Sequence, residues 1–471
     1  MSSNIVTRFA PSPTGYAHVG AVRTALFNYL FAKRYGGKLI LRFEDTDKGR
    51  SKKEFEEDIF HAMEWLGISF DSIYKQSERG VVYKKYLEKM IDAGVAYISK
   101  EDIFVEDGGE EDVLDTEDGK REKRSEVIRF KNPNSVVTFN DVILGEISVD
   151  TSELKDFVIA KSLEEPLYHL AVVIDDFEMS VSHVIRGVDG IYNTPRQILI
   201  QEAIGAPRPV YCHIPFVLGT DKAKLSKRNG SAPVFDYRKE GFLPQALINY
   251  MALLGWNPGG SKEIFSLEEL IKIFDIEKIQ KSGAVFDIEK FKWFNREHIK
   301  LLSAEDLKKN ILLFMPDYLR DLPQWSEDRF DSILPEIRSR ISVFSDVKEM
   351  SENGEFDYIF DRPVFEIAGI LPISKNGLEP DSRKIEKHLS FIINSIKNIS
   401  EEGLTKDSIK NILWDYASKE GRGDVLWPMR FSLSGKIKSL DPFTLAAILG
   451  KKETLERLES AQVRLHRFNE Q

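Results

Sequence analysis

The sequence predicts an α/β fold in the first half of the chain, with helices packed on a parallel sheet, followed by an all-helical second half. Two patterns predict this. Short β-rich apolar runs alternate with helical periodicity up to about residue 240, and helical patterns dominate from Gly241 onward. The chain has 471 residues, more than one ordinary domain of about 100–200, so we expect several packed units.

The first elements form a βαβ unit. Ile5–Phe9 is predicted to be a strand, Ala10–Gly20 a loop rich in proline and glycine, Ala21–Tyr35 an amphipathic helix, and Lys38–Phe43 a second strand. Two strands joined by one helix lie parallel, with a right-handed crossover. Their carboxyl ends should therefore lie at the same edge of the sheet.

Two later helices have recognisable starts. Ser51, with Glu54 three residues further on, forms a capping-box pattern in front of an apolar helix face. A second helix is predicted from Thr194 to about Gly205, with Thr194 as its N-cap and a proline in its first turn.

An acidic segment and further strands lie between these helices. Lys100–Glu126 lacks periodicity, and we assign it no chemistry. The alternating runs Val127–Phe130 and Val136–Val149 predict antiparallel strands of an inserted subdomain. The apolar runs Leu167–Ile174 and Val181–Ile185 predict a return to parallel strands.

The composition is that of a globular protein, with 42% hydrophobic and 30% charged residues. No run of about 18 apolar residues and no secretory signal pattern occur, so we expect a cytoplasmic protein with no membrane span. Cys212 is the single cysteine, which predicts neither a disulfide nor a zinc site. The net charge of −10 argues against a nucleic-acid partner, but a local basic face is sufficient to bind phosphates.

Two loops carry candidate chemistry. Arg8–Gly20 follows the first strand, and the next helix offers its N-terminal N–H groups and dipole to a phosphate-bearing ligand. In this loop His18 is placed to donate a hydrogen bond to a phosphate. Asp221–Gly230 has four basic residues within seven positions, which can neutralise a polyphosphate. Either loop, taken alone, is better explained as an ordinary surface loop.

Together the two loops resemble the signature pair of class I aminoacyl-tRNA synthetases, with HVGA at 18–21 as the HIGH motif and KLSKR at 224–228 as the KMSKS motif. The strings RFAPSPTGxxHVG, LRFEDTD, VIRG, NTPRQ and GFLPQALINY resemble the glutamyl-tRNA synthetase family of bacterial type in particular. So do WPMRFSLSG and AILGKKETLERL near the C-terminus. The resemblance covers nearly the whole chain except the acidic segment.

The resemblance implies roles for individual residues. The implied catalytic residues, which stabilise the transition state of adenylation, are His18 and Lys227. The implied ATP-binding residues are His18, Gly20, Lys224, Ser226 and Lys227, and the implied glutamate-binding residues are Arg8, Ser12, Glu44, Tyr168 and Arg186. Glutamate carries two carboxylates and one ammonium, so a site that buries it needs about two cations and one anion. Arg8, Arg186 and Glu44 meet that requirement.

The implied architecture is a Rossmann-like, doubly wound catalytic domain with a small insertion subdomain, followed by an all-α anticodon-binding half. The expected parts are a catalytic first half at 1–95, a reduced acceptor-end insertion at 96–160, a catalytic second half at 161–240, a stem-contact region at 241–300, and helical anticodon-binding subdomains at 301–375 and 376–471. Two features depart from the family. Val188 stands where an acid is usual, and the insertion is short and lacks zinc ligands.

The implied reaction joins L-glutamate and ATP into glutamyl-adenylate, from which the terminal adenosine of tRNA(Glu) takes the glutamyl group. We expect Mg²⁺ to accompany ATP, no metal site formed by the protein, and a monomer. Three alternatives stay open: an enzyme that also charges tRNA(Gln), a glutaminyl-tRNA synthetase, and a catalytically silent tRNA-binding paralogue. The C-terminal strings favour the all-helical glutamyl type, and the intact motif residues argue against the silent paralogue.

Arginines in the second half are candidates for reading the anticodon. The segment Leu334–Ile341 resembles the first anticodon helix bundle of the family, where an arginine recognises the third anticodon base. That base is cytosine in tRNA(Glu) and guanine in tRNA(Gln), and a reader of cytosine needs a hydrogen-bond donor for its exposed edge. The resemblance implies Arg340 at this position, with Arg338 as the alternative.

Overall fold

The computed structural model describes residues 5–47, 49–100, 126–225, 232–371 and 381–470, which fold into two compact units. Unit 1 spans Met1–His298 and unit 2 spans Ile299–Gln471, and the division falls inside helix α9 (Ile288–Leu301). Most of the acidic segment and residues 226–231 of the basic loop lie outside the described residues. The finer six-part division expected from the sequence stays a prediction.

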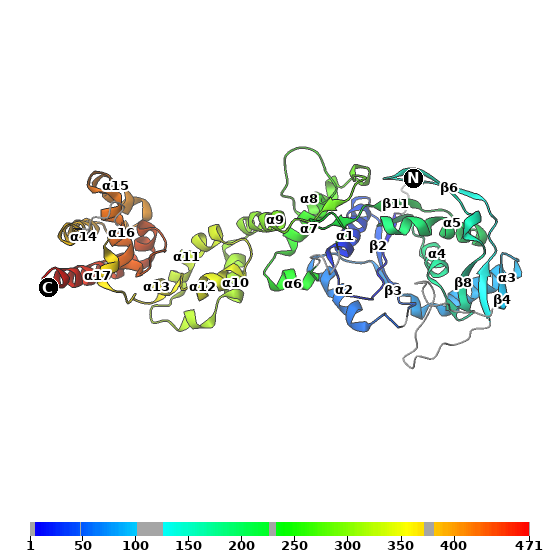
Figure 1. Cartoon of the computed structure of the whole chain (residues 1–471), viewed down its shortest axis with the longest axis horizontal. Helices are drawn as coiled ribbons and strands as arrows, with labels where there is room; N and C mark the ends of the chain where they lie inside the picture. The colour runs from blue at the N-terminus through cyan, green and yellow to red at the C-terminus, as the bar shows by residue number, and fades with distance from the viewer. Residues whose placement is uncertain (1–4, 48, 101–125, 226–231, 372–380, 471) are drawn as a thin grey trace. The chain divides into compact units, whose positions relative to one another are not determined.

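Parallel strands form the framework of unit 1 (Figure 1). They are β1 (Val6–Phe9), β2 (Lys38–Phe43), β3 (Ser72–Lys75), β10 (His183–Gly187) and β11 (Val210–Ile214). β2 pairs with β1 and β3, and β10 pairs with β11. Ser182, just before β10, donates its N–H to the Val6 carbonyl at 2.9 Å, so β10 lies next to β1. The carboxyl ends of β1 and β10 therefore meet at one edge.

Helix α1 (Val19–Arg34) joins β1 to β2 and confirms the predicted βαβ unit. Its apolar face packs on β1, with Leu26 fully buried. The helix begins two residues earlier than predicted because His18 caps it. The Nδ1 atom of His18 accepts the N–H of Gly20 at 3.1 Å and that of Ala21 at 3.4 Å, which satisfies two N–H groups at the helix start.

Residues 167–174 do not form the predicted strand. They belong to helix α4 (Tyr168–Glu178), in which Leu170, Val172 and Ile174 are all buried. A continuous apolar run is compatible with a buried strand or with a helix that is buried on most sides, and periodicity cannot separate the two. The strand prediction was wrong for that reason, whereas the next predicted strand is present as β10.

Helix α2 (Lys53–Trp65) does not begin at the predicted capping box. Lys52 is its N-cap residue and provides no side-chain hydrogen bond, so the pairing of Ser51 with Glu54 was predicted wrongly. The Ser51 N–H instead donates to the Asp47 carbonyl at 3.0 Å. This turn precedes the helix, so Ser51 lies one residue before the N-cap position.

Helix α5 (Thr194–Ile204) confirms the second predicted helix, and Gly205 ends it in the left-handed conformation. The predicted cap is wrong by one residue, because Asn193 rather than Thr194 is the N-cap. The hydroxyl of Thr194 accepts a hydrogen bond from Arg186 Nη2 at 2.7 Å. That hydroxyl therefore supports a charged side chain and not the helix start.

The antiparallel strands predicted for the insertion divide between two sheets. One sheet, in the order β4-β5-β8-β9, contains β4 (Ala96–Lys100), β5 (Glu126–Phe130), β8 (Phe157–Ser162) and β9 (Glu165–Pro166). The hairpin of β6 (Val136–Asp141) and β7 (Gly145–Asp150) is antiparallel as predicted, but it extends the sheet of β10 and β11. Asp141 pairs in parallel with Tyr211 of β11, a connection that the sequence pattern did not reveal.

Further elements of unit 1 pack around this framework. The helices are α3 (Gly80–Asp92), α6 (Val234–Lys239), α7 (Pro244–Leu253) and α8 (Leu267–Ile273). The short strands β12 (Val217–Leu218) and β13 (Ala284–Val285) pair in parallel. Helices α7 and α8 pack on α1 and support it. The first turn of α1 borders the carboxyl edge of the parallel strands.

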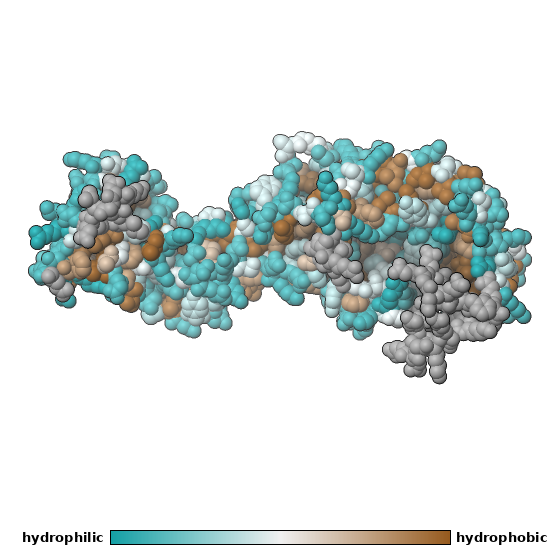
Figure 2. All heavy atoms as spheres, in the orientation of Figure 1, coloured by the Kyte–Doolittle hydropathy of each residue, from teal (hydrophilic) through white to brown (hydrophobic). Residues whose placement is uncertain are grey.

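Unit 2 is helical in its described residues, as predicted. Its helices are α10 (Ala304–Phe314), α11 (Glu327–Arg340), α12 (Asp346–Glu352), α13 (Asp357–Phe360), α14 (Ser382–Lys397), α15 (Lys406–Glu420), α16 (Arg422–Ser434) and α17 (Pro442–Glu470), which is interrupted at Gly450. Buried Arg457 donates to the carbonyls of Tyr358 and Leu433 and so links α17 to α13 and α16. Figure 2 shows a mostly hydrophilic surface with smaller hydrophobic patches. Among the described residues, no helix has the length and apolar character needed to cross a membrane.

Candidate active site

A cavity of about 580 Å³ lies at the carboxyl edge of the parallel strands of unit 1. The loop between β1 and α1, the ends of β2 and β10, the start of α4 and the chain after β11 form its walls. The predicted site residues that line it are Arg8, Ser12, His18, Gly20, Glu44, Tyr168, Arg186 and Lys224. Ser226 and Lys227, also predicted for the site, lie outside the described residues.

Hydrogen bonds to neighbouring segments hold the loop between β1 and α1. The Pro11 carbonyl accepts the N–H of Glu44 at 3.0 Å. The Ala17 N–H donates to Asp58 Oδ2 at 2.7 Å, and the Ala17 carbonyl accepts the N–H of Val234 at 2.9 Å. These bonds come from three different segments, so the loop places its side chains at defined positions beside the cavity.

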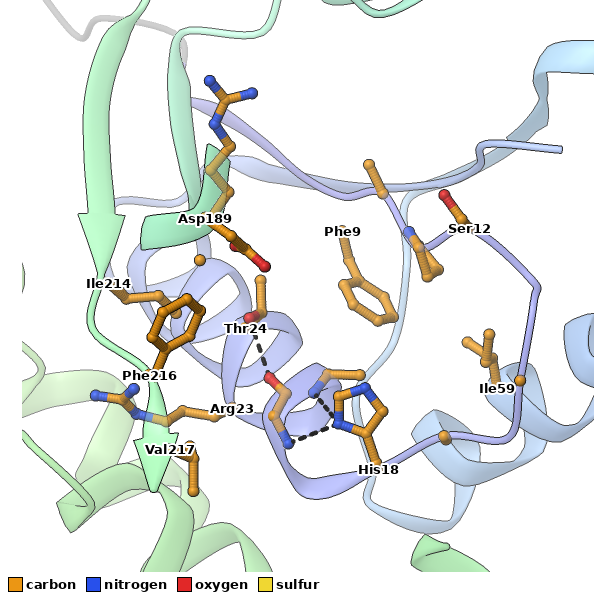
Figure 3. A pocket seen from close by; sticks show the side chains of 18 of the residues that line it. Phe9, Ser12, His18, Arg23, Thr24, Ile59, Asp189, Ile214, Phe216 and Val217 are labelled. Atoms are coloured by element: carbon orange, nitrogen blue, oxygen red, sulfur yellow. Dashed lines mark hydrogen bonds between the residues drawn. The ribbon is translucent and has the colours of Figure 1, made fainter. Parts of the chain in front are cut away.

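The capping role of His18 defines the protonation of its ring (Figure 3). Because Nδ1 accepts the N–H groups of Gly20 and Ala21, the proton of the neutral ring is on Nε2. The ring therefore has its N–H donor at Nε2, beside the first turn of α1. The N–H groups and dipole at a helix N-terminus favour an anionic ligand at the same place.

Arg8 and Glu44 belong to a buried ionic network. Arg42 donates from Nη2 to Glu44 Oε1 at 3.0 Å and from Nη1 to Asp176 Oδ1 at 2.7 Å. Arg8 Nε donates to the same oxygen of Asp176 at 3.3 Å. Arg42 is fully buried, whereas Arg8 and Glu44 both line the cavity. Arg42 and Asp176 thus hold two side chains that line the cavity.

Burial and charge oppose each other at these groups. Burial raises the pKa of Glu44, and attraction to Arg42 and Arg8 offsets only part of that rise. At Asp176, burial also raises the pKa, but attraction to Arg8 and Arg42 outweighs it, so the pKa lies below its ordinary value. Burial raises the pKa of the Tyr168 phenol as well. A further cation in the cavity beside Glu44 would therefore favour its ionised form.

Arg186, near the end of β10, is held by several acceptors. Its Nε donates to His213 Nε2 at 3.1 Å, and its Nη2 donates to the Gly190 carbonyl at 2.9 Å and to Thr194 Oγ1 at 2.7 Å. Its Nη1 is buried and has no hydrogen-bond partner among the described residues. Burial lowers the pKa of Arg186, but a guanidinium stays charged near neutral pH. A buried cationic donor of this kind beside a cavity indicates a site for an anionic group.

Lys224 lies at the rim of the cavity. Its Nζ is 3.0 Å from Asp189 Oδ2 and 4.4 Å from the centre of the Phe216 ring. Figure 3 shows Asp189 and Phe216 on the side of the cavity opposite Ser12 and Ile59. The start of the basic loop and the first loop thus face each other across the same space.

Sequence reasoning missed several residues of this site. Arg42 and Asp176 gave a usable signal, since charged residues inside apolar runs require buried partners. His213 and Asp141 gave a weaker signal, because they lie on separate strands that are distant in the sequence. Their side chains are fully buried and meet at 2.7 Å.

Comparisons with known proteins agree with the geometry. Residues 4–103 and 108–293 match the family described as tRNA synthetases class I (E and Q), catalytic domain, and residues 304–462 match the anticodon binding domain family. A glutamate–tRNA ligase from Aquifex aeolicus (strain VF5) is 38% identical, over 97% of this chain and 98% of that protein. This chain belongs to the glutamyl-tRNA synthetase family. A further relative, the glutamate–tRNA ligase of Sulfurihydrogenibium sp. (strain YO3AOP1), is 37% identical over 98% of both chains.

Solved structures of the family also match the enzyme. A glutamate tRNA ligase from Elizabethkingia meningosepticum CCUG26117, in complex with its amino acid, aligns with a TM-score of 0.80 at 32% identity, covering 98% of this chain and 100% of that one. The synthetase of Elizabethkingia anophelis aligns with a TM-score of 0.77 at 31% identity and the same coverage. The predicted fold is confirmed: a class I α/β catalytic domain precedes a helical anticodon-binding domain.

The two candidate anticodon arginines of the enzyme differ in their surroundings, although both lie in the last turn of α11. Arg338 is half-buried and donates from Nη2 to the Leu302 carbonyl at 3.0 Å. Its Nε is buried without a hydrogen-bond partner among the described residues. Arg340 is exposed and forms an ion pair with Glu355. Arg338 therefore has a structural contact inside unit 2, whereas Arg340 lies at the surface.

Proposed function

We propose that this enzyme activates L-glutamate with ATP and transfers the glutamyl group to the terminal adenosine of tRNA(Glu). The observation that carries the proposal is the arrangement of charges in one cavity. The buried Nη1 of Arg186 has no partner among the described residues, and Arg8 and Glu44 line the same space. An amino acid with a second carboxylate suits this arrangement.

Glutamate is proposed to bind with its two carboxylates at Arg8 and Arg186 and its ammonium at Glu44. An ammonium beside Glu44 would favour the ionised carboxylate, whose pKa is raised by burial in the absence of a cation. The charge count matters because a charge that is buried without its partner costs about 3–5 kcal/mol. Tyr168 and Ser12, which also line the cavity, are proposed to complete the pocket with hydroxyl groups.

ATP is proposed to bind with its phosphates at the N-terminus of α1, beside His18 and Gly20, and at Lys224, Ser226 and Lys227 of the basic loop. In the first step a carboxylate oxygen of glutamate attacks the α-phosphorus, and pyrophosphate leaves. Negative charge grows on the phosphate oxygens in the transition state. The Nε2–H of His18 and the ammonium of Lys227 are proposed to meet that charge. Most of the rate enhancement should then come from positioning and charge stabilisation.

The second step is proposed to transfer the glutamyl group to a ribose hydroxyl of the tRNA, with release of AMP. Among the described residues, no group of three or more His, Cys, Asp or Glu side chains could hold a metal ion, so no step is assigned to a metal bound by the protein. Mg²⁺ is proposed only as the counter-ion of the triphosphate. We also propose that the enzyme acts as a monomer in the cytoplasm without zinc, and that its parts follow the six-part division given by the sequence.

Aminoacylation with labelled glutamate tests the proposal. Purified tRNA(Glu) and tRNA(Gln) are incubated separately with the enzyme, ATP and labelled glutamate, and labelled glutamine serves as the amino-acid control. We expect ATP-dependent charging of tRNA(Glu) with glutamate and none with glutamine. Binding of tRNA without any charging would overturn the proposal in favour of a silent paralogue. Equal charging of both tRNAs with glutamate would show the non-discriminating alternative.

A further inference from the structure

A chain of buried groups reaches Arg186 from the interior of the sheet. Arg186 and His213 are paired residues of β10 and β11, and Arg186 Nε donates to His213 Nε2 at 3.1 Å. On the far side of the ring, His213 Nδ1 lies 2.7 Å from Oδ2 of Asp141, the last residue of β6. Adjacent strands therefore supply the successive members of this chain.

The partners define where the protons of the chain lie. A carboxylate only accepts, so His213 Nδ1 carries the proton and Nε2 of the neutral ring accepts from Arg186. Burial lowers the pKa of His213 by more than Asp141 raises it, which keeps the ring neutral at neutral pH. Burial raises the pKa of Asp141, but hydrogen bonds from His213 and from backbone N–H groups outweigh it and keep Asp141 ionised.

Asp141 is bonded as a carboxylate and not as an amide. Its Oδ2 accepts the backbone N–H of His213 at 3.0 Å as well as Nδ1–H. Its Oδ1 accepts the N–H groups of Ile143 at 3.0 Å and Leu144 at 2.9 Å. An asparagine here would turn its NH₂ group toward N–H donors in either orientation. The four donors thus specify an ionised acid beneath the histidine.

The other side of the Arg186 guanidinium is closed by Gly190 and Thr194, whose oxygens both accept from Nη2. A Cβ atom on Gly190 would lie 2.5 Å from Arg186 Nε, so the close approach requires glycine. Since Nε and Nη2 are both bonded, the guanidinium plane is fixed. Nη1 is then the nitrogen that has no hydrogen-bond partner among the described residues.

We propose that Asp141 and His213 are positioning residues of the amino-acid site, which hold the Arg186 guanidinium so that Nη1 meets a carboxylate of the substrate. The inference rests on the proposed function, in which Arg186 binds glutamate. Both side chains are fully buried, so they act through Arg186 and not on the substrate. Without the His213 acceptor, Nε would become a buried cationic donor with no partner, and the guanidinium could turn away from the cavity.

Two substitutions of His213 test this role. His213→Leu removes the acceptor at similar volume, whereas His213→Gln can place a carbonyl oxygen near the position of Nε2. In steady-state charging of tRNA(Glu), His213→Leu should raise KM for glutamate about tenfold to a hundredfold, the effect of one lost hydrogen bond to a buried charged group. KM for ATP and for tRNA should change little, and His213→Gln should restore most of the glutamate KM.

A second buried histidine provides a matched control. His298 is buried, and its Nε2 lies 3.0 Å from Asn249 Oδ1, away from the cavity lining. His298→Leu makes the same chemical change and should lower the thermal midpoint without raising KM for glutamate. Thr194→Val is a milder variant, because Gly190 still accepts from Arg186 Nη2, and it should raise the glutamate KM by a smaller factor.

The outcomes separate the positioning role from the proposed function. An unchanged glutamate KM in folded His213→Leu, or equal rises for glutamate and ATP, would overturn the positioning role. If His213→Leu does not fold, Asp141→Asn decides, because its NH₂ group would face the N–H groups from which Asp141 accepts, and an unchanged glutamate KM in that variant overturns the positioning role. A wild-type enzyme that charges no tRNA with glutamate would instead overturn the proposed function.

Discussion

The ammonium of Lys224 lies 3.0 Å from the carboxylate of Asp189 and also stands over the ring of Phe216. The charged side chains are 58% and 59% exposed, so water screens the pair, and it should contribute less than about 1 kcal/mol to stability. The pair connects the chain after β10 to the start of the basic loop, at the rim of the cavity. For function, the position of the pair at the proposed phosphate site matters more than its contribution to stability.

Lys224→Ala should therefore affect ATP more than stability. Loss of one cation at the phosphates should raise KM for ATP about tenfold, or about 1.4 kcal/mol, with a thermal midpoint close to that of the wild type. Lys262 gives a matched control, since it pairs with Glu269 and stands over the Phe265 ring at another exposed site. Charging kinetics at varied ATP check both variants, and a similar rise in Lys262→Ala would count against a role at the phosphates.

Arg186→Ala should remove a cation from the amino-acid site. A substrate carboxylate would then be buried without its partner. The resulting fall in kcat/KM for glutamate should correspond to a loss of about 3–5 kcal/mol in transition-state stabilisation. Arg208→Ala, which breaks an exposed ion pair with Glu202, is the control and should have little effect. Binding measurements with each substrate provide the decisive comparison. Equal losses for ATP and glutamate would place Arg186 elsewhere in the mechanism.

Lys227→Ala tests the proposed catalytic role of Lys227, which lies outside the described residues. If its ammonium meets charge that grows during adenylation, the turnover number should fall by roughly two to three orders of magnitude, while glutamate binding changes little. Lys222→Ala removes the same charge from the same loop and should retain turnover within a small factor. Pyrophosphate exchange in the presence of tRNA measures the step, and near-normal exchange in Lys227→Ala would reject the assignment.

His169, in the first turn of α4, should make stability depend on pH. Burial, with smaller contributions from Arg196 and Arg186, lowers the pKa of His169 to about 4. As the pH falls below the unfolded value of about 6.5, the unfolded chain binds a proton that the folded chain does not, so stability falls. The loss of stability caused by His169 should reach about 2 kcal/mol at pH 5. It should stop growing below pH 4, where the folded and unfolded chains both bind the proton.

Thermal midpoints of the wild type and His169→Gln, measured from pH 7.5 to pH 4, check this sign. Other groups titrate in the same range, so the relevant quantity is the difference between the two proteins at each pH. The wild type should lose more stability than the variant as the pH falls. Parallel curves would mean that His169 takes up its proton equally in the folded and unfolded states.

The motif-bearing part of the site was predictable from the sequence because its residues lie in short, local patterns. Arg8 lies near the end of β1 and His18 in the loop after it, Glu44 follows β2, and Arg186 lies near the end of β10. Strand order alone then predicts that these ends meet at one edge. The structure places all of them around one cavity, although their roles stay predictions.

The partners of the supporting residues were not predictable because they depend on packing between distant segments. Asp176 lies two residues beyond the predicted strand Leu167–Ile174, and only the helix α4 places it against Arg8 and Arg42. Asp141 was assigned to an insertion, and only the pairing of β6 with β11 brings it to His213. Periodicity describes one element at a time and contains no information about such pairing.

We propose that the choice of tRNA depends on one of the two arginines at the end of α11. Arg338 donates to the Leu302 carbonyl, a contact that uses its guanidinium within unit 2. Arg340 is exposed, and its partner Glu355 is half-buried with a carboxylate that an RNA base could replace. Exposed anticodon bases are read through hydrogen bonds to their edges, so the exposed arginine is the better candidate for the third base.

Arg340→Gln should then lower kcat/KM for tRNA(Glu) by a factor that corresponds to roughly 1–3 kcal/mol, the energy of one good base contact. The difference in kcat/KM between tRNA(Glu) and tRNA(Gln) should become smaller. Arg338→Gln is the matched control: it should lower the thermal midpoint through loss of the Leu302 contact but keep the preference between tRNAs. Charging of both tRNAs by the wild type and the two variants measures these effects. If Arg338→Gln changed the preference and Arg340→Gln did not, the assignments would be exchanged. A wild type that charges both tRNAs equally well would leave no discrimination for either arginine to provide, because a donor specific for cytosine must disfavour guanine.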